Sequence, residues 1–487
     1  MLACGRAGRA TETAQPPGCQ IGNAGHAGHA GHAGHAGHAG HAGHAGHAGH
    51  AGHAGHAGHA GIDAHNSRLP AQHSTICAVA GTPTTGPVRV ALVGAGKITE
   101  LTSRAYEDTE DAEVVALCDP REERLAALAA RFPDAERFGR VDDLLASGTQ
   151  ADMVEISVPT PLHCEVACQV LRAGCHVNLQ KPMATSLAEA NEMIHAAQES
   201  GSVLRVMEPY LFFEPLETLK AVVESGEIGD VAGFHMKMVG TGGGGWDVPW
   251  STLQWQFEQM AGRGLGILVF DDGWHKFAVT KWLFGPVSEV MAWIGRTELG
   301  PGIALDAPST VMWNHESGVR GVLDLTLAPD TYMRSHYYSS DERFEVTGTK
   351  GFARVNHCTA YGLGQPVLEV YSGGVLRAYQ NLDDDWGNCF SRQTAHFLQW
   401  LRHGGSAPDG SGTGDPSAGA GQRAGAGQRA RADAPSGGNT PSEPAAGPGL
   451  LLDARSAREV LALVLGAVES SKRNRPVRLD EPPWAAP

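Results

Sequence analysis

The sequence has little positive charge, few aromatic side chains and no long apolar run. It holds 37 lysines and arginines against 53 aspartates and glutamates, a formal net charge of −16. Because neutralising a phosphate backbone requires clustered basic side chains, we expect no nucleic-acid partner. No apolar run reaches the roughly 18 residues of a membrane span, and no apolar signal core stands near the start. We therefore expect a cytoplasmic protein that does not enter a membrane.

Cysteines are also sparse, since nine are scattered over 487 residues. Such an odd and dispersed set does not resemble a small disulfide scaffold, and we expect reduced, mostly buried thiols. Cys164, Cys168 and Cys175 lie close in sequence to His163 and His176. Their spacings match no closed zinc site, so burial explains them better and we predict no metal site.

Two tracts have a composition that cannot build a core. In residues 1–86 the triplet Gly-His-Ala recurs from Gly25 to Ala60, and residues 405–449 are mostly Gly, Ala, Ser, Pro, Arg and Gln. We expect a disordered N-terminal region and a flexible insertion on the surface. Imidazoles spaced by three residues can bind Zn²⁺ or Ni²⁺, so metal storage or delivery and a functionless repeat both stay open.

Alternating strand and helix patterns fill residues 87–207. The apolar strand candidates are 88–93, 114–117, 153–158 and 175–179, and the helix candidates between or after them are 121–131, 167–173 and 187–199. Strands that alternate with helices indicate a parallel sheet, and we assign this region to an α/β domain.

The alternation stops after this region. Strand candidates lengthen and follow one another at 231–239, 287–294, 319–327 and 344–355, and helix candidates lie at 216–224, 270–284, 393–402 and 454–471. The last strand region contains Gly348-Thr-Lys-Gly351, which is typical of a hairpin turn. We predict an α+β domain over 208–404, built on an open, mostly antiparallel sheet and completed by residues 450–487.

A glycine-rich turn follows the first strand. It reads Gly94-Ala-Gly96-Lys97-Ile98-Thr99 and lies between a strand and a predicted helix. The first glycine permits a tight turn, the second lets the backbone approach a pyrophosphate, and free N–H groups of a helix start favour phosphate. This context predicts a Rossmann dinucleotide-binding domain. Thr99 stands where Gly or Ala is usual, and we expect it to crowd the helix against the strand.

Asp119 supplies the second half of that pattern, because it follows the next strand 23 residues after Gly96. A carboxylate there can bind ribose hydroxyls and would repel a 2′-phosphate, which favours NAD over NADP. Arg121 and Arg124 lie near enough to leave NADP open. Asp119 can also cap the following helix, and the two roles can coexist.

Two further segments bring a family resemblance. They read Pro159-Thr160-Pro-Leu-His163 and Gln180-Lys181-Pro182. With the glycine-rich turn they resemble the Gfo/Idh/MocA oxidoreductases, from about residue 88 to 479. The resemblance implies NAD or NADP as cofactor, with the first segment beside it and Lys181 next to the nicotinamide and the reacting hydroxyl. Gln180 replaces the usual Glu, so it keeps hydrogen-bonding capacity without the negative charge.

A later segment carries a carboxylate and an imidazole. Asp271 and His275 are four residues apart in a predicted helix, so their side chains can converge. Oxidation of a carbinol needs a base with a pKa near neutrality, and His275 fits. The segment is similar to the same family's catalytic helix. The resemblance implies that Asp271 binds substrate or orients the base, while Lys181 polarises the oxygen.

Trp246 and Trp250 follow a run of glycines, and their faces could either pack on sugar C–H surfaces or belong to the core.

The leading hypothesis is an NAD(P)-dependent oxidoreductase acting on a hydroxyl of a sugar, polyol or related cyclic compound. The alternatives are a redox-assisted glycosidase on the same residues and a sugar or dinucleotide sensor without turnover. The resemblance also implies a homo-dimer or homo-tetramer.

Overall fold

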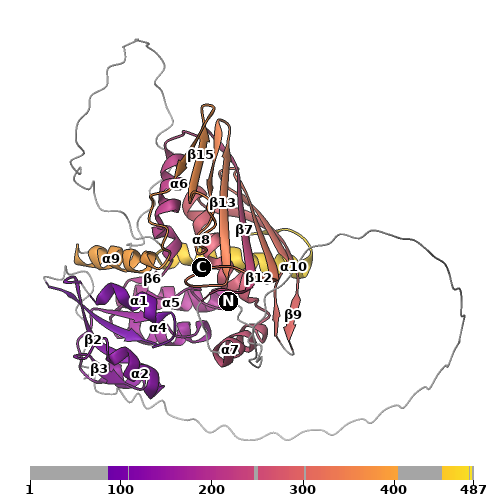
Figure 1. Ribbon diagram of the computed structural model, residues 1–487. Helices are drawn as coiled ribbons and strands as arrows, with labels where there is room; N and C mark the ends of the chain where they lie inside the picture. The colour runs from indigo at the N-terminus through magenta and orange to yellow at the C-terminus, as the bar shows by residue number, and fades with distance from the viewer. Residues whose placement is uncertain are drawn as a thin grey trace, which may run out of the picture. The chain divides into compact units, whose positions relative to one another are not determined.

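The computed structural model describes residues 86–107, 109–245, 250–300, 303–403, 452–481 and 483–484. The predictions for the Gly-His-Ala tract and for the insertion fall outside these residues. No helix within the described ranges has the length and apolar character that a membrane span needs. Two sheets organise the chain, and helices pack against both (Figure 1).

The first sheet has six parallel strands in the order β3-β2-β1-β4-β5-β6. They are β1 (Val88–Val93), β2 (Ala112–Cys118), β3 (Glu136–Phe138), β4 (Met153–Ile156), β5 (His176–Leu179) and β6 (Leu204–Val206). The helices that connect them are α2 (Glu122–Ala129), α3 (Val141–Ala146), α4 (His163–Arg172) and α5 (Leu187–Ser200). Strands buried on both faces become nearly continuous apolar runs, as β1 does. The predicted Rossmann fold is confirmed.

The second sheet has nine strands in the order β16-β15-β14-β13-β7-β12-β11-β8-β17. They are β7 (Val231–Gly243), β8 (Val287–Ile294), β11 (Ser309–His315), β12 (Arg320–Tyr332), β13 (Ser340–Gly348), β14 (Gly351–Val355), β15 (Leu368–Ser372), β16 (Val375–Tyr379) and β17 (Val477–Arg478). Only the β7–β12 pair is parallel, so the predicted mostly antiparallel sheet is confirmed. The hairpin expected at Gly348 joins β13 to β14. A separate ribbon pairs β9 (Thr297–Gly300) with β10 (Ile303–Leu305).

The second sheet has one buried and one open face. Its buried side chains pack with α6 (Glu214–Glu224), α8 (Gly273–Phe284) and α10 (Ala454–Arg473) in one hydrophobic core. On the opposite face, Trp293 and Met312 stay exposed. Alternation with period two places successive side chains on opposite faces, which gives a strand pattern of one buried and one exposed row.

Helix α9 (Asn388–Arg402) contributes to two hydrophobic cores. Cys389 and Phe390 belong to the core of the second sheet, whereas Phe397 and Leu398 join the core that lies on β1. Figure 1 shows α9 beside α1. Helical periodicity identifies which face of a helix is apolar, but it does not identify the sheet that this face will cover.

Candidate active site

The glycine-rich turn leaves β1 at the carboxyl edge of the first sheet. Gly94 has φ +98°, and a Cβ there would lie 2.5 Å from the carbonyl oxygen of Ser157. By contrast, a Cβ on Gly96 would meet no heavy atom within 4 Å. Gly94 is therefore required by the turn itself, while the absence of a side chain at Gly96 leaves space beside the backbone for a ligand.

Thr99 is accommodated without the expected crowding. Its hydroxyl is buried and donates to the carbonyl oxygen of Gly94 at 2.8 Å, which closes the turn. The helix that begins here is short, because α1 (Thr99–Thr102) passes at once into the 3₁₀ turn η1 (Ser103–Tyr106). A polar side chain fits because it replaces a packing contact with a hydrogen bond.

Asp119 lies beside this turn and is nearly buried. Its Oδ2 accepts from the backbone N–H of Ala95 at 2.8 Å, and its Oδ1 accepts from the N–H of Arg121 at 2.9 Å. The carboxylate thus braces both the glycine turn and the start of the next helix region. Each carboxylate oxygen keeps a further lone pair that could accept a hydrogen bond from a ligand.

The other predicted cofactor residues differ in what they contact. Pro159 is exposed, Thr160 is buried, and Ile98 packs against the hydrophobic core. The Nζ of Lys97 pairs with Glu100 at 2.6 Å. These residues thus range from exposed to buried, and they share no single environment.

His163, which was predicted to lie beside the cofactor, is surrounded by backbone carbonyl groups. The side chain is fully buried, its Nδ1 lies 2.9 Å from the carbonyl oxygen of Pro182, and its Nε2 lies 2.9 Å from that of Val158. Burial lowers the pKa of His163, so its ring is neutral and its single N–H donates to only one of these two carbonyl oxygens. His163 ties the segment after β5 to the segment after β4.

Gln180 directly follows β5, and one half of its side-chain amide is hydrogen-bonded within the chain. Its Oε1 accepts from the N–H of Lys181 at 2.8 Å, whereas its Nε2 is buried and has no hydrogen-bond partner among the described residues. A buried donor without a partner is costly, and a ligand hydroxyl would satisfy it. Together with the space at Gly96 and the carboxylate of Asp119, this donor fits a dinucleotide.

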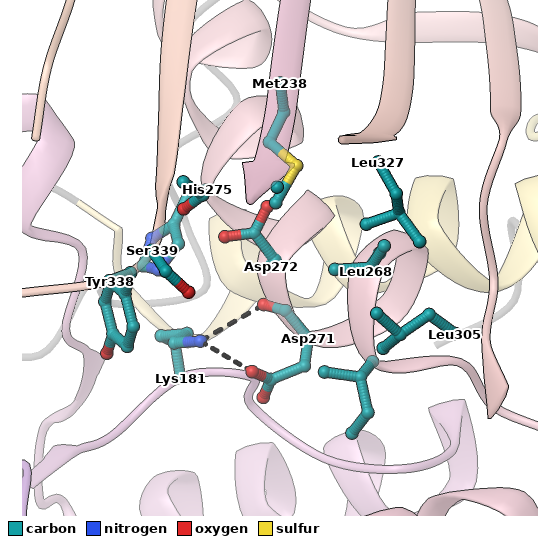
Figure 2. A pocket seen from close by; sticks show the side chains of 13 residues that line it. Lys181, Met238, Leu268, Asp271, Asp272, His275, Leu305, Leu327, Tyr338 and Ser339 are labelled. Atoms are coloured by element: carbon teal, nitrogen blue, oxygen red, sulfur yellow. Dashed lines mark hydrogen bonds and ion pairs between the residues drawn. The ribbon is translucent and has the colours of Figure 1, made fainter. Parts of the chain in front are cut away.

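Lys181 meets Asp271 across the two sheets. Its Nζ lies 3.1 Å from Oδ2 of Asp271 and 3.1 Å from the carbonyl oxygen of the same residue, as the dashed lines in Figure 2 show. The side chains are 13% and 8% exposed, so solvent screens this pair poorly. The pair brings together two of the three predicted catalytic residues.

Asp271 lies in a π-helical turn, η4 (Ile267–Asp272), which runs into α8. The turn is held by Asp306, whose carboxylate accepts from the N–H groups of Leu268 at 2.8 Å and Val269 at 2.7 Å. Asp306 could not be identified from the sequence, since no motif surrounds it. π-turns often occur at functional sites, where they re-aim side chains.

A pocket opens where these segments meet, and both Asp271 and His275 line it, as their spacing predicted. In Figure 2 the apolar side chains lie on one side of the Lys181–Asp271 pair, and Tyr338 and Ser339 lie on the other. The lining residues are Lys181, Met238, Gly240, Ile267, Leu268, Asp271, Asp272, His275, Leu305, Leu327, Tyr338, Ser339 and Ser340. The pocket thus combines a charged pair and an imidazole with hydroxyl groups and an apolar wall.

The imidazole of His275 has a carboxylate partner that the sequence analysis missed. Its Nδ1 lies 2.7 Å from Oε1 and 3.0 Å from Oε2 of Glu208, and both side chains are buried. Burial raises the pKa of Glu208 to about 8. Burial, followed by the charges of Lys181 and Lys276, lowers the pKa of His275 well below its usual value. In the sequence, the one feature that marks Glu208 is its position as a single glutamate within an apolar run.

Two other expectations concern tryptophans and metals. Trp246 and the side chain of Trp250 lie outside the described residues, although α7 (Trp250–Ala261) begins at the latter. Among the described residues, the thiols of Cys164 and Cys168 come within 4.8 Å of a carboxylate oxygen of Glu192, without the histidines considered from sequence. Of the six cysteines that the structure describes, five have free thiols (Cys118, Cys164, Cys168, Cys358 and Cys389), and Cys175 is disulfide-bonded, against the expectation.

Comparison with protein families agrees with the fold. Residues 88–208 match the model of the oxidoreductase family with an NAD-binding Rossmann fold, GFO_IDH_MocA, and residues 216–354 match a GFO/IDH/MocA C-terminal domain. The chain belongs to the Gfo/Idh/MocA oxidoreductase family.

Characterised relatives act on sugars and polyols. The chain is 28% identical to the D-apiose dehydrogenase of Paraburkholderia graminis over 293 residues, 59% of this chain and 72% of that protein. It is 25% identical to the myo-inositol 2-dehydrogenase of Thermotoga maritima over 319 residues, 65% of this chain and 84% of that protein.

Solved structures share the fold at lower identity. An oxidoreductase from Agrobacterium radiobacter in complex with NAD⁺, L-tartaric acid and magnesium superimposes with a TM-score of 0.60 at 20% identity, covering 80% of this chain and 98% of that one. The WlbA dehydrogenase from Bordetella pertussis in complex with NADH and UDP-GlcNAcA gives 0.58 at 21% identity, covering 82% and 99%.

Proposed function

We propose that this chain is an NAD-dependent dehydrogenase that interconverts a hydroxyl and a keto group on a sugar, polyol or related cyclic substrate. One observation carries the proposal. Lys181 follows the first sheet, Asp271 and His275 come from the helix beside the second, and all three line one pocket. Removal of a hydroxyl proton requires a base and a cationic hydrogen-bond donor, and the pocket holds both in an imidazole and a paired lysine.

In the proposed reaction, a nicotinamide dinucleotide held by Gly94, Gly96, Asp119 and Gln180 would supply the hydride acceptor or donor. The substrate hydroxyl binds between Nζ of Lys181 and Nε2 of His275. As the carbon–hydrogen bond breaks, the hydroxyl proton passes to Nε2, and the carbonyl oxygen keeps the hydrogen bond from the lysine. The low pKa of His275 keeps its ring neutral, so that it is ready to accept a proton.

Asp271 has a supporting role in this scheme. It holds the ammonium group of Lys181 through Oδ2 and its carbonyl oxygen, which uses two of the three N–H groups. The third can donate to the substrate oxygen. A preorganised donor in a poorly hydrated pocket stabilises developing negative charge without reorganisation. Lys276 does not compete, since it is buried between Asp272 at 2.8 Å and Glu342 at 3.0 Å.

We propose NAD rather than NADP as the cofactor. The support is Asp119, whose buried carboxylate braces the glycine turn through Ala95 and holds its charge beside Gly96. A 2′-phosphate at this position would face like charge, whereas ribose hydroxyls would find acceptors. For the remaining cofactor contacts we propose Gly94, Gly96 and Gln180.

The open face of the second sheet supports a homo-oligomer of two or four chains, which we also propose. Trp293 is 51% exposed and Met312 is 39% exposed, on neighbouring strands of that face. Large apolar side chains on a solvent face favour association. Light scattering after size exclusion would give the mass directly, and a monomer at micromolar concentration would contradict this part.

The function is tested by titrating the purified protein with NADH and NADPH, following tryptophan fluorescence, and then assaying a panel of polyols and aldoses at the nicotinamide absorbance. We expect tighter binding of NADH and turnover of at least one panel member. Lys181→Ala and His275→Ala should bind NADH normally and lose turnover. Binding without turnover across the panel would favour a sensor, and absence of binding would contradict the proposal.

A further inference from the structure

Glu208 lies behind the imidazole that lines the pocket, in the segment between the two sheets. It follows β6 and precedes the 3₁₀ turn η3 (Pro209–Phe212). Only 1% of its side chain is exposed, yet it does not line the pocket. Its carboxylate faces Nδ1 of His275 with both oxygens. A carboxylate in that position determines which ring nitrogen carries hydrogen.

Several groups fix the position of this carboxylate. The N–H of Tyr210 donates to Oε1 of Glu208 at 3.1 Å, and the Tyr210 ring packs on the His275 ring with centroids 4.9 Å apart. The backbone N–H of Glu208 donates to Oε1 of Gln393 on α9 at 2.8 Å. The carbonyl of Gln393 in turn accepts from the buried Arg205 at 2.9 Å. Helix α9 therefore anchors Glu208 from the side of the first sheet.

The second ring nitrogen of His275 is left for the pocket. Nδ1 is occupied by Glu208, and Nε2 makes no hydrogen bond with the described part of the chain. When the carboxylate is ionised, Nδ1 donates to it and Nε2 presents a lone pair. When the carboxyl group is protonated, it donates to Nδ1, and Nε2 then carries the hydrogen. The two residues hold one exchangeable proton between them.

We propose that Glu208 is a positioning residue of the dehydrogenase reaction: it selects the tautomer of His275, so that Nε2 accepts a proton in oxidation and donates one in reduction. The inference rests on the proposed function. In oxidation the substrate O–H bond breaks, the N–H bond forms at Nε2, and Nδ1–H stays bonded to the carboxylate. The pair then carries one additional proton, which it returns to solvent before the next turnover. Reduction runs through the same steps in reverse.

The charges around the pair come from every element that packs against it. Lys181 follows β5, Arg205 lies on β6, and Asp272 and Lys276 belong to η4 and α8. The three cations favour the ionised carboxylate, and Asp272 opposes it. Burial outweighs them and raises the pKa of Glu208, so the pair titrates within an accessible pH range.

The first test is kinetic and compares Glu208→Gln with Glu214→Gln. The control makes the same substitution six residues further on, where the carboxylate accepts from the N–H of Asp383 at 2.7 Å, away from the pocket. We expect Glu208→Gln to lower kcat by about 10- to 1000-fold with little change in KM, since the ring keeps a hydrogen-bond acceptor but loses the charge that stabilises its protonated form. The pH profile of kcat for Glu208→Gln should no longer show the change that protonation of the Glu208–His275 pair causes. Glu208→Asp should restore part of that change.

The second test reads the tautomer without turnover. Protein labelled with ¹⁵N-histidine is titrated by NMR, and His275 is assigned from the signals missing in His275→Gln. We expect the hydrogen to move from Nε2 to Nδ1 as pH rises in wild type and in Glu214→Gln, and to stay on Nδ1 in Glu208→Gln while the ring is neutral. An unchanged tautomer and an unchanged kcat profile in Glu208→Gln would overturn the inference. If the tautomer shift is seen but wild type turns over no substrate, the proposed function fails and the role of Glu208 in that reaction fails with it.

Discussion

Nζ of Lys181 lies 3.1 Å from Oδ2 of Asp271, although the two residues are 90 positions apart and belong to segments next to different sheets. The pair is weakly hydrated, and it holds a cation at the entrance to a pocket that also contains His275. The chemistry of the site therefore depends on how the two sheets are joined, and several measurable consequences follow from this geometry.

Lys181 and Asp271 should behave as one unit. Because Asp271 orients the ammonium group, Lys181→Met should lower kcat by on the order of 10²- to 10³-fold, and Asp271→Asn should cause a smaller loss. The double variant should be little worse than Lys181→Met alone, since an orienting group is useless without its partner. Steady-state kinetics of wild type, the two single variants and the double variant gives the coupling free energy between the two side chains. Additive losses would mean that the two side chains act independently.

The two glycines of the turn should respond differently to alanine. Gly94→Ala forces an unfavourable φ and a contact with Ser157, so it should reduce the free energy of unfolding by about 2 kcal/mol or more. Gly96→Ala meets open space, so stability should hardly change while the Kd for NADH rises. Urea unfolding and fluorescence titration separate the effects. Equal destabilisation by both variants would show that the space at Gly96 is not a ligand site.

The contribution of Thr99 to the same turn can be tested by measuring stability alone. Thr99→Val keeps the shape of the side chain but removes the hydrogen bond to the carbonyl oxygen of Gly94. The free energy of unfolding should fall by about 1 kcal/mol, and Thr99→Ser should retain most of it. Denaturant titration of the three proteins checks this. A Thr99→Val protein as stable as wild type would show that the hydroxyl contributes nothing to the turn.

The direction of reaction should determine the pH dependence. Burial raises the pKa of Glu208 to about 8, so the Glu208–His275 pair keeps its proton below that pH and loses it above. Oxidation needs the pair without this proton, and its kcat should rise with pH through this region. Reduction needs the proton, and its kcat should fall. Initial rates in both directions over a pH series test the sign, and parallel profiles in both directions would contradict it.

Chelation should leave turnover unchanged. In the pocket Asp271 is paired with Lys181 and Asp272 with Lys276, so neither carboxylate is available to a divalent cation without breaking an ion pair. Dialysis against EDTA, followed by assay and elemental analysis, checks this. Activity that disappears and returns with added zinc would contradict it, and Cys164→Ser would then test the thiol cluster as the source.

Local patterns predicted the parts of the site that follow strands. Gly94, Asp119 and Lys181 each follow a parallel strand, and the carboxyl ends of such strands meet at one edge, so their proximity was foreseeable. Asp271 and His275 share a helical face for an equally local reason. Residues whose role depends on tertiary packing could not be placed this way. Glu208 meets His275 across 67 residues of chain, and the packing of Phe397 in α9 against β1 is equally non-local.

The most direct measurement is isotope transfer. The protein is incubated with NAD⁺ and carbon-deuterated polyols from the panel, and the nicotinamide product is analysed by mass spectrometry. The account predicts reduced cofactor carrying one deuterium from a substrate carbon, formed by wild type and by Glu214→Gln but not by Lys181→Ala or His275→Ala. Bound cofactor that gains no deuterium from any polyol would contradict the assignment of this pocket to hydride transfer.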